Sequence, residues 1–214
     1  MPFIVTVAQR KGGAGKTTLC CQLTAALAGR GLSVAAIDMD DQRSLARWAE
    51  TRATRLGELD FALQTANGYS ISAGVRRARN AEIVLLDTPP SVEPAVARAI
   101  GLADLVLAPM QLSPLDLDAS LPTARIIGDA RKQALFVINR APPRARVADR
   151  IRAEIARYEL PVAGVELGSR AAFAESIADG RGVVETDPRG RAAQEITALT
   201  DEVLAIAGLA RAAA

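Results

Sequence analysis

With 214 residues and a net charge of +2, the chain is long enough for one α/β domain with a substantial core, and its overall charge selects no class of partner. Half of the residues are hydrophobic but only 3% are aromatic, so the core must consist mainly of Ala, Val, Leu and Ile, which disfavours a β-sandwich. No apolar run approaches the roughly 18 residues that span a bilayer, and the start lacks a basic leader, so we expect a cytoplasmic protein without membrane insertion.

Short apolar runs rich in β-branched residues alternate with helical patterns along the chain. The runs predict buried parallel strands at 3–8, 33–38, 81–87, 104–109 and 134–139, and 59–66 is a candidate for a further strand. The segments between them predict helices at 16–29, 43–53, 92–101, 115–130, 145–158, 170–179 and 190–209. This order is typical of an α/β fold with a doubly wound, mostly parallel sheet flanked by helices. We expect a single domain over 1–214, without an N-terminal DNA-binding module because the first strand starts at residue 3.

The segment AQRKGGAGKTT, residues 8–18, lies between the first expected strand and the first expected helix, where phosphate-binding loops occur. It completes the second half of the pattern G-x-x-x-x-G-K-[ST], but Arg10 stands where the first glycine belongs, and Lys11 follows it. Glycines let consecutive backbone N–H groups face phosphate oxygens, and the N-terminus of the next helix adds positive charge. The loop therefore predicts a nucleotide site formed by Gly12, Gly13, Ala14, Gly15, Lys16, Thr17 and Thr18, with the Thr17 hydroxyl as a Mg²⁺ ligand.

Carboxylates follow two of the expected strands, as a phosphoryl-transfer site requires. Asp87 ends the apolar run at 83–87 and is our candidate for the metal side of the site, acting through water. Asp38, Asp40 and Asp41 follow the second strand, and Asp38 and Asp40 would share one side if the strand continued. Acids this close repel one another unless Mg²⁺ or a lysine lies nearby. Asp40 is the candidate for positioning the attacking water.

The segments RKGGAGKTT, AAIDMDDQ and IVLLDTPP, in this order, resemble the ParA/MinD family of deviant Walker-A P-loop ATPases over essentially the whole chain, closest to its small single-domain partition members. The resemblance implies that Lys11 is the signature lysine, which reaches phosphates bound by the second subunit, so that ATP lies between the two copies of a homodimer. It implies catalytic roles for Lys11, Lys16 and Asp40, and Mg²⁺ ligation by Thr17, Asp40 and Asp87.

The resemblance also extends to the base of the nucleotide and departs from the family at one position. Asn139 matches an asparagine that contacts adenine, and the stretch VVETDP around Pro188 resembles a loop that closes over the base. A strand-end asparagine is, however, also a common turn residue. Asp41 stands where the family has proline, which removes a rigid turn residue and adds an acid beside Asp40.

Basic residues are concentrated in residues 125–157, which contain nine Lys and Arg but only three Asp and Glu. Such a cluster is either a solvated arginine-rich surface or a site for a polyanion. The resemblance implies binding of nonspecific, nucleoid DNA by the ATP dimer and its release when a ParB-like or other adaptor stimulates hydrolysis, so that a plasmid, chromosome or protein cargo is segregated or positioned. The candidate DNA contacts are Arg144, Arg146, Arg150, Arg170, Arg189 and Arg191.

Three alternatives on the same scaffold stay open at this point. A membrane-associated MinD-like division regulator needs a basic amphipathic C-terminal helix, whereas residues 195–209 contain three acids and no basic residue. An electron-transfer iron protein needs cysteines that bridge a cluster, and Cys20 and Cys21 lie in an apolar helical run that favours burial. A small-molecule ligase has no excluding feature in the sequence, because fold does not fix function.

Overall fold

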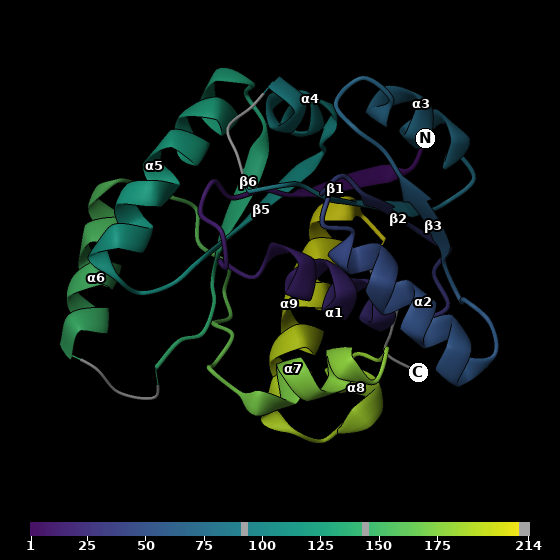
Figure 1. The fold of residues 1–214 in the computed structure, drawn as a ribbon. Helices are drawn as coiled ribbons and strands as arrows, with labels where there is room; N and C mark the ends of the chain where they lie inside the picture. The colour runs from purple at the N-terminus through teal and green to yellow at the C-terminus, as the bar shows by residue number, and fades with distance from the viewer. Residues whose placement is uncertain (91–93, 143–145, 210–214) are drawn as a thin grey trace.

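A computed structural model describes residues 1–90, 94–142 and 146–209, except the side chains of residues 146 and 147. Six parallel strands form one sheet in the order β3-β2-β4-β1-β5-β6 (Figure 1). Their bounds are β1 (Phe3–Val7), β2 (Val34–Asp38), β3 (Ala62–Thr65), β4 (Ile83–Asp87), β5 (Leu105–Met110) and β6 (Gln133–Ile138). The predicted doubly wound α/β fold is confirmed.

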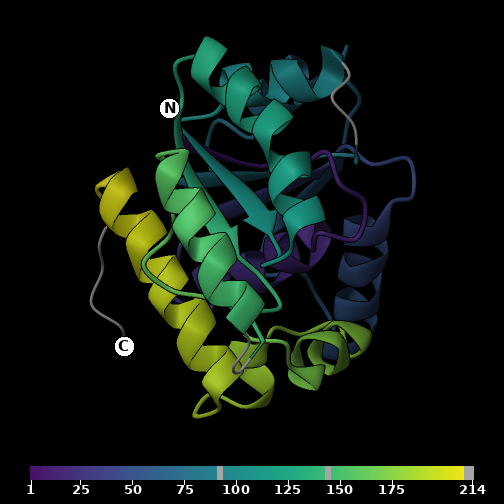
Figure 2. The same cartoon turned by 90° about the vertical axis from the view of Figure 1, so that its left-hand side faces the viewer.

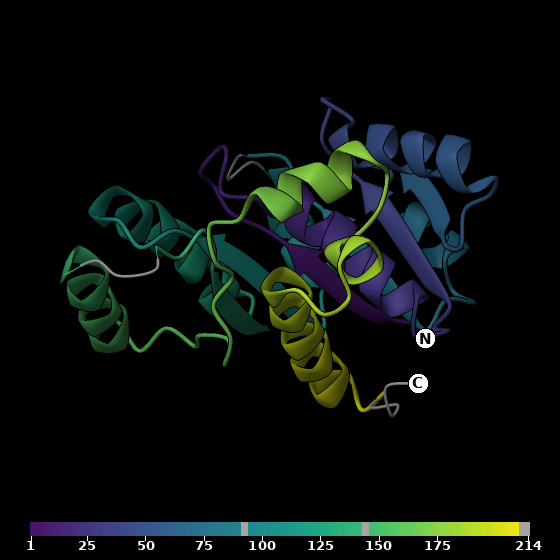
Figure 3. The same cartoon turned by 90° about the horizontal axis from the view of Figure 1, so that it is seen from below.

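The described helices lie on both faces of the sheet. They are α1 (Lys16–Ala28), α2 (Ser44–Leu56), α3 (Ile71–Arg77), α4 (Pro94–Leu102), α5 (Pro114–Asp129), α6 (Arg146–Arg157), α7 (Ala171–Ala178), α8 (Val183–Thr186) and α9 (Arg191–Ala207). α1, α2 and α9 cover one face, with α7 and α8 packed on α1 (Figure 3). α3, α4, α5 and α6 cover the other face, where α5 and α6 lie side by side (Figure 2).

The two faces follow from the alternation of side chains along each strand. Val34 and Ala36 of β2 belong to the core beneath α1 and α2, whereas Ala35 and Ile37 belong to the core beneath α3. All four side chains are buried, because helices cover both faces. This explains why the strands are continuous apolar runs and not alternating ones.

The predicted strands and most predicted helices agree with the structure to within a few residues, and the candidate strand at 59–66 is the short edge strand β3. The sequence analysis missed α3 and α8, which have 7 and 4 residues. Both are too short for a helical period to stand out. α3 also contains Gly74, a poor helix former, which packs close to Ile37 under the sheet.

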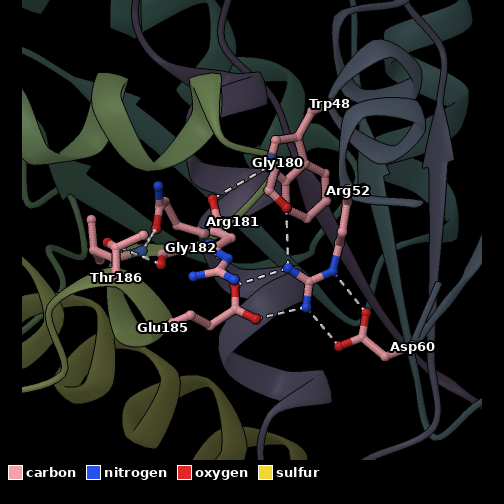
Figure 4. Close-up of polar contacts among 10 residues, drawn as sticks. Trp48, Arg52, Asp60, Gly180, Arg181, Gly182, Glu185 and Thr186 are labelled. Carbon is pink, nitrogen blue, oxygen red and sulfur yellow. Dashed lines mark hydrogen bonds and ion pairs between the residues drawn. The ribbon is translucent and has the colours of Figure 1, made fainter. Parts of the chain in front are cut away.

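A buried guanidinium joins α2 to the segment between α7 and α8 (Figure 4). Arg52 donates to both carboxylate oxygens of Asp60, at 2.7 and 2.8 Å, and to both of Glu185, at 2.8 Å, and it also donates to the carbonyl of Gly180. Its guanidinium lies 5.7 Å from the centroid of the Trp48 ring. The Arg52 side chain is 2% exposed, whereas those of Asp60 and Glu185 are 43% and 27% exposed, so the acids compensate a buried charge from the surface. Arg52 therefore holds α8 and the segment that precedes it against α2.

Candidate nucleotide-binding site

The phosphate-binding loop lies at the carboxyl edge of β1 and leads directly into α1, which begins at Lys16. Gly13 and Gly15 have positive φ values of 73° and 99°, a conformation that glycine adopts without strain. At Gly15 glycine is needed for a second reason, because a Cβ atom there would lie 2.2 Å from Nδ2 of Asn139. The loop thus has the backbone that its sequence predicts, with the N-terminus of α1 directed at the site.

The backbone at the start of the loop explains why Arg10 can stand where the phosphate-loop pattern has its first glycine. Arg10 is not among the residues with positive φ, so its conformation does not require glycine. Its N–H donates to the side-chain oxygen of Gln9 at 2.8 Å. Gln9 is buried and also binds Ser120 and Thr123 of α5. The loop therefore starts against α5 and bends only where Gly13 and Gly15 allow it.

Lys16 and Asp87 place opposite charges inside the site. Both side chains are buried, and burial lowers the pKa of Lys16 while the carboxylates of Asp87 and Asp40 oppose this shift. Burial raises the pKa of Asp87 to about 7; the Thr17 hydroxyl and Lys16 counteract this effect, and Asp38 and Asp40 add to it. β4 sets Asp87 in register with Val7, the last residue of β1, so it lies beside the start of the loop.

The buried carboxylate of Asp87 is a candidate ligand for a cation. Neither of its oxygens has a hydrogen-bond partner of normal geometry among the described residues, although the nearby Thr17 hydroxyl lowers its pKa. A buried carboxylate without partners costs several kcal/mol, so it is normally paired or near a metal. No cluster of three or more His, Cys, Asp or Glu side chains that could hold a metal occurs in 1–90, 94–142 and 146–209. The donor set fits Mg²⁺ shared with nucleotide phosphates and water.

The acids after β2 form an ordered turn beside Asp87. Asp38 is in register with Asp87 on the neighbouring strand and accepts hydrogen bonds from the N–H groups of Asp40 and Ala46. Asp40 accepts one from the N–H of Gln42 at 2.9 Å. Asp40 and the exposed Asp41 line a hollow of about 550 Å³ between the segments that follow β2 and β4. Asp38 thus fixes the turn, and Asp40 is the carboxylate open to the site.

Lys11 is held by a partner that the sequence analysis missed. Its Nζ lies 2.7 Å from Oδ2 of Asp116 in the first turn of α5, and the same carboxylate accepts a hydrogen bond from the Ser113 hydroxyl. Lys11 is 36% exposed, whereas Asp116 is 4% exposed. The sequence Ser113-x-x-Asp116 is a sign of a helix start but not of a lysine partner. In the single chain Lys11 therefore points neither into the phosphate loop nor into bulk solvent.

A cavity of about 120 Å³ adjoins the loop at Gly15, and Lys11 is not among the residues that line it. One wall consists of Gly15 and the first turns of α1, and the other consists of residues 167–170 and α7. Asn139 lines it, but its Nδ2 donates to the carbonyl of Ala14 at 2.8 Å and its Oδ1 accepts from the N–H of Arg140. Asn139 therefore supports the loop directly, and contact with a base stays a prediction.

Known proteins with similar sequences show the family to which the chain belongs. A family model described as VirC1 protein matches residues 2–212. The maintenance of carboxysome distribution protein A of Halothiobacillus neapolitanus is 31% identical over 209 residues, 94% of this chain and 96% of that protein. Protein virC1 of Rhizobium rhizogenes is 34% identical over 149 residues, 67% of this chain and 64% of that protein. The chain belongs to the VirC1 family of ParA/MinD-type P-loop ATPases. The predicted family resemblance is confirmed.

A solved structure supports the fold of this VirC1-family chain. The septum site-determining protein MinD of Pyrococcus horikoshii, complexed with Mg-ADP, superposes with a TM-score of 0.80 at 18% identity and covers 98% of both chains. The expected cofactors, ATP and Mg²⁺, agree with the Mg-nucleotide in that structure. No described helix of this chain is long and apolar enough to cross a membrane.

The contact of Pro188 with the base stays a prediction in this VirC1-family chain. Pro188 is exposed in the turn between α8 and α9 and does not line the cavity beside the loop. The wall there comes from Leu167, Gly168, Ser169 and Arg170, ahead of α7. That prediction followed the resemblance of the stretch VVETDP to a family loop. The wall of 167–170 is set by backbone hydrogen bonds of Leu167 and Ser169 to the end of β6 and the residues after it.

The arginines predicted to contact DNA have different environments in this VirC1-family chain. Arg150, Arg189 and Arg191 are exposed and form no ion pair with another described residue. Arg170 is bound by Glu195 and lines the cavity, so it adds little free charge to the surface. Within 125–157, Arg152 and Arg157 are paired with acids, which reduces the free positive charge of α6. Arg144 and the side chain of Arg146 lie outside the described parts.

Proposed function

We propose that this chain is an ATPase that dimerises around ATP, binds nonspecific DNA as the dimer and releases it after hydrolysis stimulated by a partner protein. The observation that supports this most is the position of Lys11, beside the phosphate loop but paired with Asp116 at a partly exposed site. A triphosphate is more negative than one Lys16 and a helix N-terminus neutralise. A second lysine supplied by another copy of the chain would complete the charge balance.

The residues of one chain have separate parts in the proposed reaction. Backbone N–H groups around Gly13 and Gly15 would bind the phosphates, and Lys16 would draw charge from the β- and γ-phosphates. Thr17 and Asp87 would hold Mg²⁺, which when bound neutralises phosphate charge and stabilises the charge that develops on hydrolysis. Asp40, fixed by the turn that Asp38 organises, would orient the attacking water.

The proposed role in positioning agrees with the family and with the relative named for carboxysome distribution. A ParA/MinD-type ATPase moves cargo when its attachment to a surface depends on the nucleotide. We propose the nucleoid as this surface and a protein or DNA assembly as the cargo, with an adaptor that stimulates hydrolysis. A small-molecule ligase would instead show ATP turnover that depends on its substrate and needs neither DNA nor an adaptor.

Asp40→Ala is expected to lower ATP hydrolysis at least about 100-fold and to leave the ATP-dependent dimer intact, because the acid orients water but does not hold the phosphates. Phosphate release with the adaptor and size-exclusion chromatography with ATP measure the two effects. Asp41→Ala is the matched control, since Asp41 is exposed and makes no hydrogen bond or ion pair to another described residue. Its hydrolysis should stay within about threefold of wild type. Full hydrolysis by Asp40→Ala would remove Asp40 from the proposed reaction.

Retention on nonspecific duplex DNA is expected to require ATP and to fall steeply with salt, because phosphate contacts release counterions. Charge reversal at Arg150, Arg189 or Arg191 should weaken retention and lower the salt slope by about one for each phosphate contact that the arginine makes. Arg76→Glu is the control, since this exposed arginine lies on α3, at the opposite edge of the sheet from α6 (Figure 1). Filter retention or fluorescence anisotropy measures binding. Retention that is equal without nucleotide would contradict the DNA part of the proposal.

A further inference from the structure

Arg170 lies at the rim of the cavity beside the phosphate loop and has a fixed side chain. It precedes α7 and lines the cavity together with Leu167, Gly168 and Phe173. Its Nη2 donates to Oε1 of Glu195 at 2.6 Å, and its Nε lies 3.2 Å from each oxygen of the same carboxylate. Arg170 is 37% exposed and Glu195 is 14% exposed. The guanidinium is thus held at the cavity mouth by one acid of α9.

Gly168 allows the guanidinium of Arg170 to lie close to the backbone. A Cβ atom at Gly168 would lie 2.9 Å from Nη2 of Arg170, so the guanidinium packs directly on the glycine backbone. The N–H of Gly168 donates to Oε2 of Glu195 at 3.0 Å. One carboxylate therefore positions both the loop backbone and the arginine above it. This explains why the arginine keeps one orientation although it is partly exposed.

The groups that this wall can still offer a ligand are limited. The N–H groups of Leu167, Gly168 and Ser169 are engaged with Ile138, Glu195 and Ala141, respectively. Nη1 of Arg170 makes no hydrogen bond to another residue in the described ranges, and the side chain lines the cavity and is 37% exposed. A guanidinium is planar and stacks on aromatic rings. The opposite wall, with Thr18 and Leu19 at the start of α1, leaves a narrow space next to the phosphate loop.

We propose that Arg170 is a nucleotide-binding residue whose guanidinium covers the purine base, and that Glu195 is its positioning residue. This inference rests on one part of the proposed function, namely that the phosphate loop binds a nucleotide. It assigns Arg170 to the base end of that nucleotide and not to DNA. A flat base between α1 and the wall of 167–170 would meet the guanidinium that lines the cavity, while its phosphates reach the loop at Gly13 and Gly15.

Arg170→Ala tests this assignment by isothermal titration calorimetry with ATP, ADP and inorganic tripolyphosphate. The dissociation constants of ATP and ADP should both rise about tenfold, because the guanidinium stacks on the base, which the two nucleotides share. Tripolyphosphate has no base, so its dissociation constant should stay unchanged. Arg170→Lys keeps the charge but not the plane and should bind both nucleotides several-fold more weakly than wild type. Arg76→Ala, at an exposed arginine of α3 that does not line the cavity, is the control.

Glu195→Gln tests the positioning role. The amide cannot hold the guanidinium as tightly, so nucleotide affinity should fall, but it should fall no further when Glu195→Gln is added to Arg170→Ala. Additive losses would show that Glu195 acts through something other than Arg170. Circular dichroism melting identifies a variant that fails to fold, and Arg170→Lys then carries the test.

Two results would overturn the inference. Unchanged ATP and ADP affinity in Arg170→Ala would exclude a base contact. Loss of DNA retention at saturating ATP, with nucleotide affinity intact, would make Arg170 a DNA contact as the sequence analysis expected. Both leave the proposed function standing, because wild type binds nucleotide in each case. A wild-type protein that binds neither ATP nor ADP would overturn the proposed function and this inference together.

Discussion

Lys11→Ala is expected to bind ATP with nearly normal affinity and to lose nucleotide-dependent dimerisation. The side chain of Lys11 is paired with Asp116, outside the loop in which we propose that Lys16 and the backbone of Gly13 and Gly15 bind the phosphates. Its removal therefore leaves the single-chain site intact but deprives a second copy of a cation. Losing one partner of a close interfacial charge pair costs about 2–5 kcal/mol, so the dimer dissociation constant should rise at least about thirtyfold.

Light scattering coupled to size-exclusion chromatography in the Asp40→Ala background measures this effect, because the nucleotide then stays intact. Asp116→Asn is the informative control. It weakens the hold of α5 on Lys11, which must leave Asp116 at 2.7 Å to reach another subunit. We expect Asp116→Asn to dimerise with ATP at least as well as wild type. Normal dimerisation of Lys11→Ala would show that the lysine does not cross an interface.

Asp87→Asn is expected to stabilise the ligand-free protein at pH 8 and to abolish Mg²⁺-dependent ATP hydrolysis. Burial raises the folded-state pKa of Asp87 to about 7 from an ordinary value of 3.8. The folded state thus binds the proton more tightly than the unfolded state, so the free energy of unfolding falls as pH rises from about 4 to about 7 and stays low above this range. Asparagine carries no charge and removes this loss, on the order of 2–4 kcal/mol at pH 8.

Thermal melting of both proteins between pH 5 and pH 8 without nucleotide measures the stability effect. The melting temperature of Asp87→Asn should exceed that of wild type by roughly 5–10 °C at pH 8, and the gap should close towards pH 5. Phosphate release with Mg²⁺ measures the loss of activity. Parallel pH profiles would show that Asp87 is not the group that titrates, and a variant that still hydrolyses ATP would show that it does not hold the metal.

The sequence predicted structure well where a short pattern of residues has a single physical explanation. Continuous apolar runs indicated buried parallel strands. The carboxyl ends of such strands meet at one edge of the sheet, where Val7 before the loop, Asp38 and Asp87 lie in register. Pro188 does not line the cavity beside the phosphate loop, and its contact with a base, expected from the resemblance of the stretch VVETDP, stays a prediction. The short helices α3 and α8 had too few residues for a helical period.

The sequence by itself determined the strands, the phosphate loop and its carboxylates, because apolar runs, glycine conformation and strand ends are local properties. Only the tertiary structure decided what surrounds them. Asp116 pairs with Lys11 across 105 residues, Asn139 supports Ala14 across 125, and Glu195 positions Arg170 across 25. Each of these contacts depends on how a helix or strand packs against a loop, and side-chain packing between distant segments leaves no periodic signal in the chain.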